Sequence, residues 1–258
     1  TTVLAMVTMI FSKDAGSEYS ISRFDEASGN IAFHEIPHTW NESTGKCIYC
    51  GASREVYERG EDKESHAYQF IHTDNPKELF NNMKFDVIIG NPPYQLSDGG
   101  GRDSSAIPLY DKFVIQAMKL SPRYLIMIVP ARWYTGGKGL DAFRDKMLND
   151  ERLSIIHDFP ETKDCFPGLN IRGGICYFKW DSCHQGKSLI VNHVKGEEYT
   201  MERSLKEGKV PMLIRYNKAI SILRKVQKFN EETFNNIVSS RNPFGLPSNF
   251  SGYSKRYS

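Results

Sequence analysis

Short apolar runs alternate with helical patterns between residues 67 and 159, and this alternation constrains the fold more than any other feature of the sequence. The runs have the length of strands, and we predict strands at Ala67–Ile71, Phe85–Ile89, Tyr124–Val129 and Leu153–Phe159. The intervening patterns predict a brief helix or turn and then two helices, at Pro76–Asn82, Leu109–Leu120 and Leu140–Leu148. Such alternation is typical of a parallel, doubly wound α/β sheet, whose functional loops follow the carboxyl ends of its strands.

The segments that flank this alternation have weaker patterns. Apolar residues at helical spacing predict a buried helix over Val3–Phe11, and the turn-rich, charged region from about residue 12 to 65 reads as an insertion. After the last predicted strand, Gly174–Trp180 and Ser188–His193 are two apolar runs joined by a polar turn. We expect these two runs to form a closing hairpin.

Composition excludes several classes of protein. A chain of 258 residues with 40% hydrophobic residues can bury a full core. No run approaches the roughly 18 apolar residues of a membrane span, and the start of the chain lacks the pattern of a signal peptide. Five cysteines, an odd number, argue against a disulfide framework and for free thiols or a metal site. We therefore expect a cytoplasmic protein that does not enter a membrane.

The net charge of +2 is unevenly distributed. Residues 201–258 contain eleven Lys and Arg against four Glu, which gives this part +7 and leaves −5 for the rest. This basic end is where the chain would contact nucleic acid phosphates, but the charges by themselves favour the simpler interpretation of a solvated helical face.

The segment Phe85-Asp-Val-Ile-Ile-Gly-Asn-Pro-Pro-Tyr94 carries the chemistry. It is a buried strand that runs into a stiff loop at the edge where α/β sheets hold their active sites. Asn91 offers a side-chain acceptor, Pro92 and Pro93 rigidify the loop and leave carbonyl groups available, and Tyr94 adds an aromatic face. The loop can therefore hold a planar amine. A strand that merely ends in a rigid turn would explain Pro-Pro alone, but not the whole segment.

Asn-Pro-Pro-Tyr after such a strand resembles the signature of amino-methyltransferases, and specifically of the gamma-order adenine methyltransferases. The resemblance implies S-adenosylmethionine as methyl donor and a catalytic role for Asn91, Pro92, Pro93 and Tyr94. Asn91 Oδ1 and the Pro92 carbonyl would accept the N–H groups of the target nitrogen, while Tyr94 stacks on the base. Because an adenine inside a duplex cannot reach such a loop, the resemblance also implies base flipping.

The same resemblance assigns two further residues. Asp74 follows the predicted strand Tyr68–Ile71, where the family has an Asp that binds the cofactor's adenine amine; capping the turn at Asn75 is the other interpretation. The segment from Asp164 to Phe178 resembles the motif whose aromatic residue contacts the flipped base, and Phe166 holds that position. A core phenylalanine at the end of a loop is an equally good interpretation of Phe166.

Residues from about Cys47 to Trp180 resemble the methylase domain of Eco57I-type restriction-modification enzymes. The resemblance implies a class I, Rossmann-like methyltransferase sheet in a prokaryotic enzyme that transfers methyl groups to adenine N6 of double-stranded DNA. We expect residues 1–194 to form part of the catalytic domain and 195–258 to begin the target-recognition region. A nuclease domain or subunit is a further implied partner.

One family feature is missing from the sequence. Gamma-order enzymes carry a glycine-rich cofactor loop upstream of the catalytic signature, whereas the glycine clusters here, 99–101 and 136–139, lie downstream of it. We expect the loop to precede Thr1, so that the chain is truncated at its N-terminus and binds S-adenosylmethionine poorly by itself.

Cys47-x-x-Cys50-Gly inside the insertion has the spacing of half a structural zinc site. His38 and His66 flank the pair and are the candidates for the other two ligands. A pair of free thiols is the alternative, and a redox role fits less well because no strand-helix context surrounds the pair.

Two other functions stay open. The signature also occurs in enzymes that methylate a glutamine amide of release factors, and in RNA methyltransferases; the 164 residues that follow Tyr94 favour a DNA substrate. The other alternative is a non-catalytic DNA-binding module with a decayed methylase fold, which the intact signature disfavours.

Overall fold

The computed structural model describes residues 36–57, 69–80, 82–96, 107–208 and 210–232. The helix predicted over Val3–Phe11, the beginning of the strand predicted at Ala67, and His66 lie outside these ranges. The chain divides into two compact units, residues 1–217 and 218–258. No helix within the described ranges is long and apolar enough to cross a lipid bilayer.

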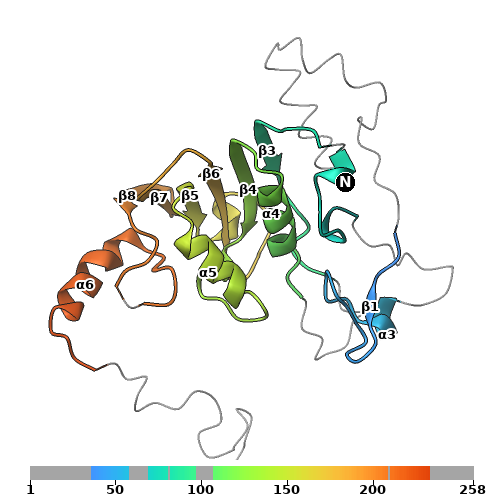
Figure 1. The fold of residues 1–258 in the computed structure, drawn as a ribbon. Coiled ribbons are helices and arrows are strands. Elements are labelled where there is room, and N and C mark those ends of the chain that lie inside the picture. The colour runs from blue at the N-terminus through green and yellow to red at the C-terminus, as the bar shows by residue number, and fades with distance from the viewer. Residues whose placement is uncertain (1–35, 58–68, 81, 97–106, 209, 233–258) are drawn as a thin grey trace, which may run out of the picture. The chain divides into compact units, whose positions relative to one another are not determined.

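A six-stranded sheet forms the centre of the first unit (Figure 1). Its strand order is β3-β4-β6-β5-β7-β8, and the strands cover Val87–Gly90, Tyr124–Pro130, Ile175–Asp181, Leu153–Phe159, Ser188–Val194 and Glu197–Arg203 in that order. β3 and β4 are parallel, as are β5 and β7, while β6 runs antiparallel to both of its neighbours. The predicted α/β class is confirmed, but the prediction of an all-parallel sheet is wrong, because β6 and β8 run antiparallel to their neighbours.

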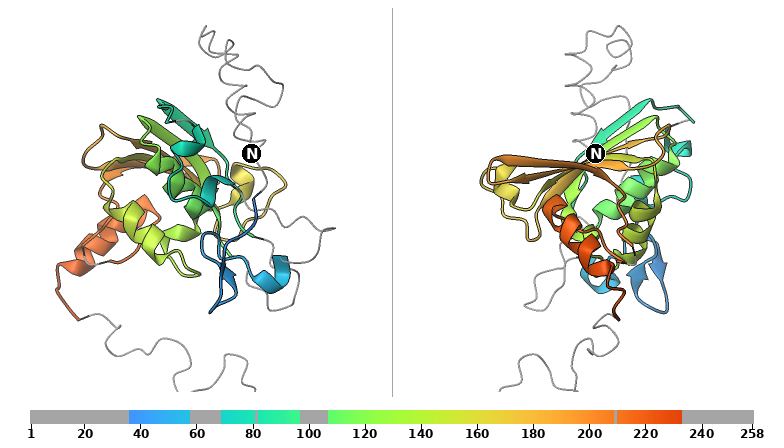
Figure 2. Two further views of the ribbon diagram at one scale, coloured as in Figure 1. Left: turned by 45° about the vertical axis from the view of Figure 1, so that its right-hand side comes forward. Right: turned by 90° about the vertical axis from the view of Figure 1, so that its left-hand side faces the viewer.

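Helices α4 (Tyr110–Lys119) and α5 (Asp141–Asn149) lie on one side of this sheet (Figure 2). One face of the sheet carries a set of deeply buried side chains, because the strand register aligns them. They are Leu125, Met127, Val129, Ile156, Cys176, Phe178 and Trp180. The core of the unit lies between this face and the two helices, and it matches the apolar residues from which the strands were predicted.

Short elements connect the larger ones. They are η1 (Gln69–Ile71), η2 (Glu78–Phe80), η3 (Ala131–Tyr134) and η4 (Thr162–Asp164), together with a small hairpin of β1 (Trp40–Asn41) and β2 (Lys46–Cys47), followed by α3 (Arg54–Tyr57). The remaining helix, α6 (Asn217–Gln227), begins at the last residue of the first unit and continues in the second.

The strand predicted at Tyr68–Ile71 is wrong, because Gln69–Ile71 form the 3-10 helix η1. Phe70 and Ile71 are both buried, and the Phe70 ring lies 5.9 Å from that of Phe113 on α4. A short apolar run can bury its side chains in either conformation, so periodicity does not distinguish them. Here packing against α4 favours the helical turn.

The hairpin predicted from Gly174–Trp180 and Ser188–His193 is also wrong. Both segments are strands, but β5 lies between them in the sheet. The hairpin forms one strand later, where β7 and β8 are joined by Lys195-Gly196. Both of these residues have positive φ, 53° and 80°, which is the backbone of the turn that suits a two-residue hairpin.

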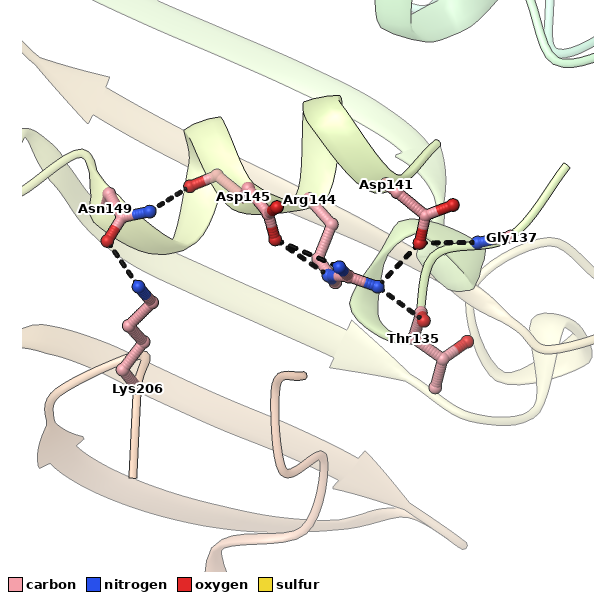
Figure 3. Close-up of polar contacts among 7 residues, drawn as sticks. All are labelled: Thr135, Gly137, Asp141, Arg144, Asp145, Asn149 and Lys206. Carbon is pink, nitrogen blue, oxygen red and sulfur yellow. Dashed lines mark hydrogen bonds and ion pairs between the residues drawn. The ribbon is translucent and has the colours of Figure 1, made fainter. Parts of the chain in front are cut away.

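The glycine cluster at 136–139 forms the turn that leads into α5 (Figure 3). Arg144 holds this turn, since its Nη1 donates to the Thr135 carbonyl at 3.0 Å and to Asp141 Oδ1 at 2.8 Å. Gly136 has φ +76°, and a Cβ there would collide with both Arg144 and Asp141. These glycines therefore form the turn through which the chain enters α5.

Candidate functional site

The Asn91–Tyr94 loop begins where β3 ends, at the carboxyl edge of the sheet. Its far end is fixed by an antiparallel bridge between Gln95 and Pro108. The Leu109 N–H donates to the Tyr94 carbonyl at 3.1 Å, and the Leu96 N–H donates to the Ile107 carbonyl at 2.9 Å. The loop is thus anchored on one side by the strand and on the other by the start of α4.

Two of the hydrogen-bond acceptors on this loop have no partner among the described residues. Asn91 is exposed, and its side-chain amide makes no hydrogen bond to any described residue. The Pro92 ring is buried, while its carbonyl accepts no hydrogen bond from the described part of the chain. The Tyr94 carbonyl, in contrast, accepts from the Leu109 N–H just before α4.

Tyr94, at the end of the loop that follows β3, is half-buried. Burial raises the pKa of Tyr94 to about 12, and the thiols of Cys165 and Cys176 contribute to that rise. At neutral pH the ring is uncharged, as a stacking surface for a base requires.

Thr162 shapes the loop that holds Phe166. Its hydroxyl donates to the Ile171 carbonyl at 3.1 Å and accepts from the Ile171 N–H at 3.3 Å. Its carbonyl accepts from the Phe166 N–H at 2.7 Å. Phe166 is half-buried at the middle of this closed loop. β3 and β5 run in the same direction, since β3 is parallel to β4 and both β4 and β5 are antiparallel to β6, so the loops that follow them leave from the same edge of the sheet.

A buried ion pair, which sequence reasoning missed, lies beside the Phe166 loop. Asp158 near the end of β5 is 1% exposed, and Arg215 holds both of its oxygens at 2.8 Å. Arg215 Nη1 also donates to the Gly173 carbonyl at 2.7 Å. Asp158 in a largely apolar strand was a signal that a partner exists, because a buried carboxylate needs one. Its identity, 57 residues away, could not be deduced.

The environment of Asp158 is strongly desolvated. Burial raises the pKa of Asp158 above its usual range, while the hydrogen bonds and charge of Arg215 oppose the shift. The neighbouring Tyr134 is fully buried, and this raises its pKa well above the ordinary value. The guanidinium of Arg215 also lies 5.6 Å from the centre of the Tyr134 ring. Asp158 and Tyr134 are buried and Arg215 is largely so, and the three side chains therefore pack together inside the fold.

Asp74 lies apart from the Asn91–Tyr94 loop. Its side chain is exposed, and its carbonyl accepts from Lys119 Nζ at 3.3 Å. Lys119 is the last residue of α4, whereas Tyr94 is hydrogen-bonded to Leu109, just before the first residue of this helix. The two ends of the ten-residue helix are about 14 Å apart. The turn after Asp74 is capped by Asn75, whose Oδ1 accepts from the Lys77 N–H. The cofactor role of Asp74 stays a prediction.

Three of the four predicted zinc ligands come together. His38, Cys47 and Cys50 form one cluster with His72, and their ligand atoms all lie within 4.8 Å of one another. Sequence reasoning missed His72, because this residue directly follows a segment that was predicted to be a strand of the catalytic sheet. That segment instead forms η1. His66, the predicted fourth ligand, lies outside the described residues.

The comparisons with known proteins agree with the motif. The family model of the Eco57I restriction-modification methylase matches residues 3–166. A curated relative, an uncharacterized adenine-specific methylase of Mycoplasma pneumoniae, is 41% identical over 180 residues, which are 66% of this chain and 43% of that protein. The chain therefore spans less than half the length of this relative.

Two solved structures are more distant. A type I restriction-modification methyltransferase subunit from Streptococcus thermophilus is 14% identical, with a TM-score of 0.32 over 58% of this chain and 33% of that one. A modification subunit of a putative type I restriction enzyme from Vibrio vulnificus is also 14% identical, with a TM-score of 0.36 over 58% and 40%. The family match covers well over half of the sequence and includes the Asn91–Tyr94 loop. With its Rossmann-like sheet and this loop, the chain belongs to the Eco57I restriction-modification methylase family.

Proposed function

We propose that this chain carries the catalytic loop of a DNA adenine-N6 methyltransferase that uses S-adenosylmethionine and acts in a restriction-modification system. The observation that carries the proposal is that two acceptors at the carboxyl end of β3, the Asn91 amide oxygen and the Pro92 carbonyl, have no hydrogen-bond partner in the described part of the chain. Membership of the family supports the same chemistry.

The acceptors address the central difficulty of the reaction. An exocyclic amino group is a poor nucleophile, because its lone pair is delocalised into the ring. Two oxygens that accept its N–H protons favour tetrahedral nitrogen and localise the lone pair for in-line attack on a methyl group. Pro92 and Pro93 keep these acceptors in place without the entropy cost of a mobile loop.

Two aromatic residues would hold the base. Tyr94 is neutral at physiological pH, since burial raises its pKa to about 12, and its ring can stack on the base. Phe166, on the loop closed by Thr162, would contact the base from another side. An adenine must leave the duplex to reach a site between two loops, so we infer base flipping.

S-Adenosylmethionine would supply an electrophilic methyl group. Among the described residues, Asn91 is the one that we expect to lie next to this methyl group. The acceptor side of the site fits this chemistry, since the Asn91 amide is exposed and free of described hydrogen bonds. We keep the contact of Asp74 with the cofactor's adenine amine as a prediction. If it holds, Asp74→Ala raises the Kd for S-adenosylmethionine in calorimetry and leaves DNA affinity unchanged.

The deciding experiment uses the complete protein to which this chain belongs, with tritiated S-adenosylmethionine and duplex DNA of varied sequence. Asn91→Ala removes one acceptor, and we expect kcat to fall by about 100-fold or more with little change in DNA affinity. Asn91→Asp keeps an oxygen acceptor and should retain more activity than the alanine variant. Asn149→Ala, on the exposed end of α5, is the matched control and should leave kcat unchanged.

Equal kcat values for wild type and Asn91→Ala would refute the role of the loop. Methyl transfer to RNA or to a glutamine amide, with none to duplex DNA, would instead refute the substrate and leave the loop chemistry intact. Identification of N6-methyladenine in the digested product gives the position of the methyl group.

A further inference from the structure

The cluster of His38, Cys47, Cys50 and His72 lies outside the methyl-transfer loop. His38 precedes β1, Cys47 ends β2, and Cys50 follows in the turn after it, whereas His72 follows η1, more than twenty residues later. Cys47, Cys50 and His72 are buried, and His38 is partly buried. Two thiols and two imidazoles thus converge from separate segments.

We infer that these four residues bind one structural zinc ion, which joins the β1–β2 hairpin to η1. Two cysteines and two histidines in one cluster are the donor set that zinc prefers in closed, four-coordinate sites. Two thiolates would balance the charge of the ion, so the buried site would carry no net charge.

The distances suit a single ion. With zinc bonds of about 2.3 Å to sulfur and about 2.0 Å to nitrogen, the ligand atoms of a tetrahedral site lie about 3.3 to 3.8 Å apart. Cys50 Sγ and His38 Nδ1 are 3.4 Å apart, within that range. The other ligand atoms lie within 4.8 Å, so a small contraction completes the tetrahedron.

The backbone of the Cys-x-x-Cys turn is already arranged for two ligands. The Gly51 N–H donates to the Cys47 carbonyl at 2.9 Å, and the Cys47 N–H donates to the Ala52 carbonyl at 2.8 Å. Gly51 has φ +77°, a conformation that a side chain would strain. The turn therefore directs both thiols to one side.

A disulfide or ordinary packing would explain less of the cluster. A bond between Cys47 and Cys50 would leave the two imidazoles without a role, and both thiols are free in the structure. Rings do pack there, since His72 lies 5.2 Å from His38 and 5.6 Å from Tyr49. Packing alone, however, does not require two nitrogens and two sulfurs to point at one another.

The ion would connect the insertion to the catalytic sheet. His72 precedes Thr73, whose carbonyl accepts from Gln116 Nε2 on α4 at 2.5 Å. Asp74 is held to Lys119 of the same helix. Through His72, zinc would therefore tie the hairpin to a segment that is attached to α4, which covers the sheet.

The test begins with the metal content of this 258-residue protein, purified without a chelating tag and under reducing conditions. We expect about one zinc ion per chain by mass spectrometry. With cobalt in place of zinc, the visible spectrum should show tetrahedral bands together with thiolate charge-transfer bands. Neither measurement depends on a variant that must fold.

Variants then identify the ligands. His72→Ala and Cys50→Ser should weaken zinc binding by about 100-fold or more in competition with a chelator, and Cys50→Ser should reduce the charge-transfer bands. Cys183→Ser and His184→Ala, which change the same residue types on the turn after β6, are the matched controls and should bind zinc as the wild type does. His66→Ala should also retain zinc, because the four ligands are complete without it.

Two results would overturn the inference. One is a protein that contains no zinc and takes up none on titration, or a cobalt spectrum without thiolate bands. The other is loss of zinc in His66→Ala with retention in His72→Ala. None of these outcomes depends on methyl transfer, so the proposed function stands or falls separately.

Discussion

Gly174 is the residue with the least freedom to change near the candidate site. Its φ is +75°, its carbonyl accepts from the Ala131 N–H at 3.0 Å, and it directly precedes β6. A Cβ at this position would collide with the Phe159 carbonyl and would lie 2.6 Å from the Pro160 carbonyl and 2.7 Å from Arg215 Nη2. Gly173 also has positive φ, +92°, but a Cβ there would meet nothing within 4 Å. The two neighbours therefore separate backbone strain from steric collision.

Gly173→Ala should cost about 1–2 kcal/mol, the strain of a left-handed alanine. Gly174→Ala adds a collision with backbone atoms, which cannot move as a flexible side chain can, and should cost about 2 kcal/mol more. Urea unfolding of the 258-residue protein measures both values. Equal unfolding free energies for the two variants would contradict the close approach at Gly174.

At the level of elements, β5 depends on a side chain from outside the sheet. Asp158 is bound by Arg215, and Asn192 on β7 adds a hydrogen bond at 3.3 Å. Arg215→Met leaves the carboxylate buried and unpaired, so we expect a loss of about 3–5 kcal/mol in the free energy of unfolding. Glu42→Gln, which breaks the exposed pair of Glu42 with Arg54, is the control and should change it by less than about 1 kcal/mol. Similar losses of unfolding free energy in both variants would show that the buried pair stabilises the fold no more than the exposed pair does.

The same strand should make stability depend on pH. His157 contacts His193 at 2.9 Å between ring nitrogens, and burial, with a smaller effect of His193, lowers the pKa of His157. Folding therefore favours the neutral ring: the stability it contributes is complete above about pH 6.5, the pKa in the unfolded chain, and is lost as the pH falls through the lower folded value.

His157→Asn should accordingly lose less stability than the wild type when the pH is lowered from about 7.5 to about 5, a range that spans the unfolded pKa. The observable is the difference between the two unfolding free energies at each pH, which cancels the contribution of other groups. His184→Asn should follow the wild type. If the unfolding free energies of the wild type and of His157→Asn change equally with pH, His157 is not the origin of the pH dependence.

At the level of the whole molecule, positive charge is concentrated toward the C-terminal end of the sequence. Residues 201–258 carry +7, and α6 contributes three basic residues to it. Exposed Ile222, Val226 and Phe229 accompany these charges. If this region contacts DNA phosphates, as the proposed function implies, affinity should fall steeply with salt.

Replacing four basic residues of this region by Gln should reduce the slope of log K against log salt by about 0.9 for each phosphate that the variant no longer neutralises; the four are Lys218, Arg224, Lys225 and Lys228. The control replaces four exposed lysines of the first unit, namely Lys77, Lys138, Lys146 and Lys187. Fluorescence anisotropy with a short duplex gives both slopes. An unchanged slope in the α6 variant would indicate a merely solvated helix.

Sequence alone determined the features that are contiguous in the chain. The strand before Asn91, the acceptors of the loop and the helices at α4 and α5 follow from local patterns, because period and loop chemistry are encoded by neighbouring residues. Tertiary structure decided what depends on contacts between distant residues: the insertion of β6 between β4 and β5, the pairing of Asp158 with Arg215, and the presence of His72 beside Cys47 and Cys50. A buried charge or half a metal site indicates that partners exist, but packing of the whole chain selects which residues they are.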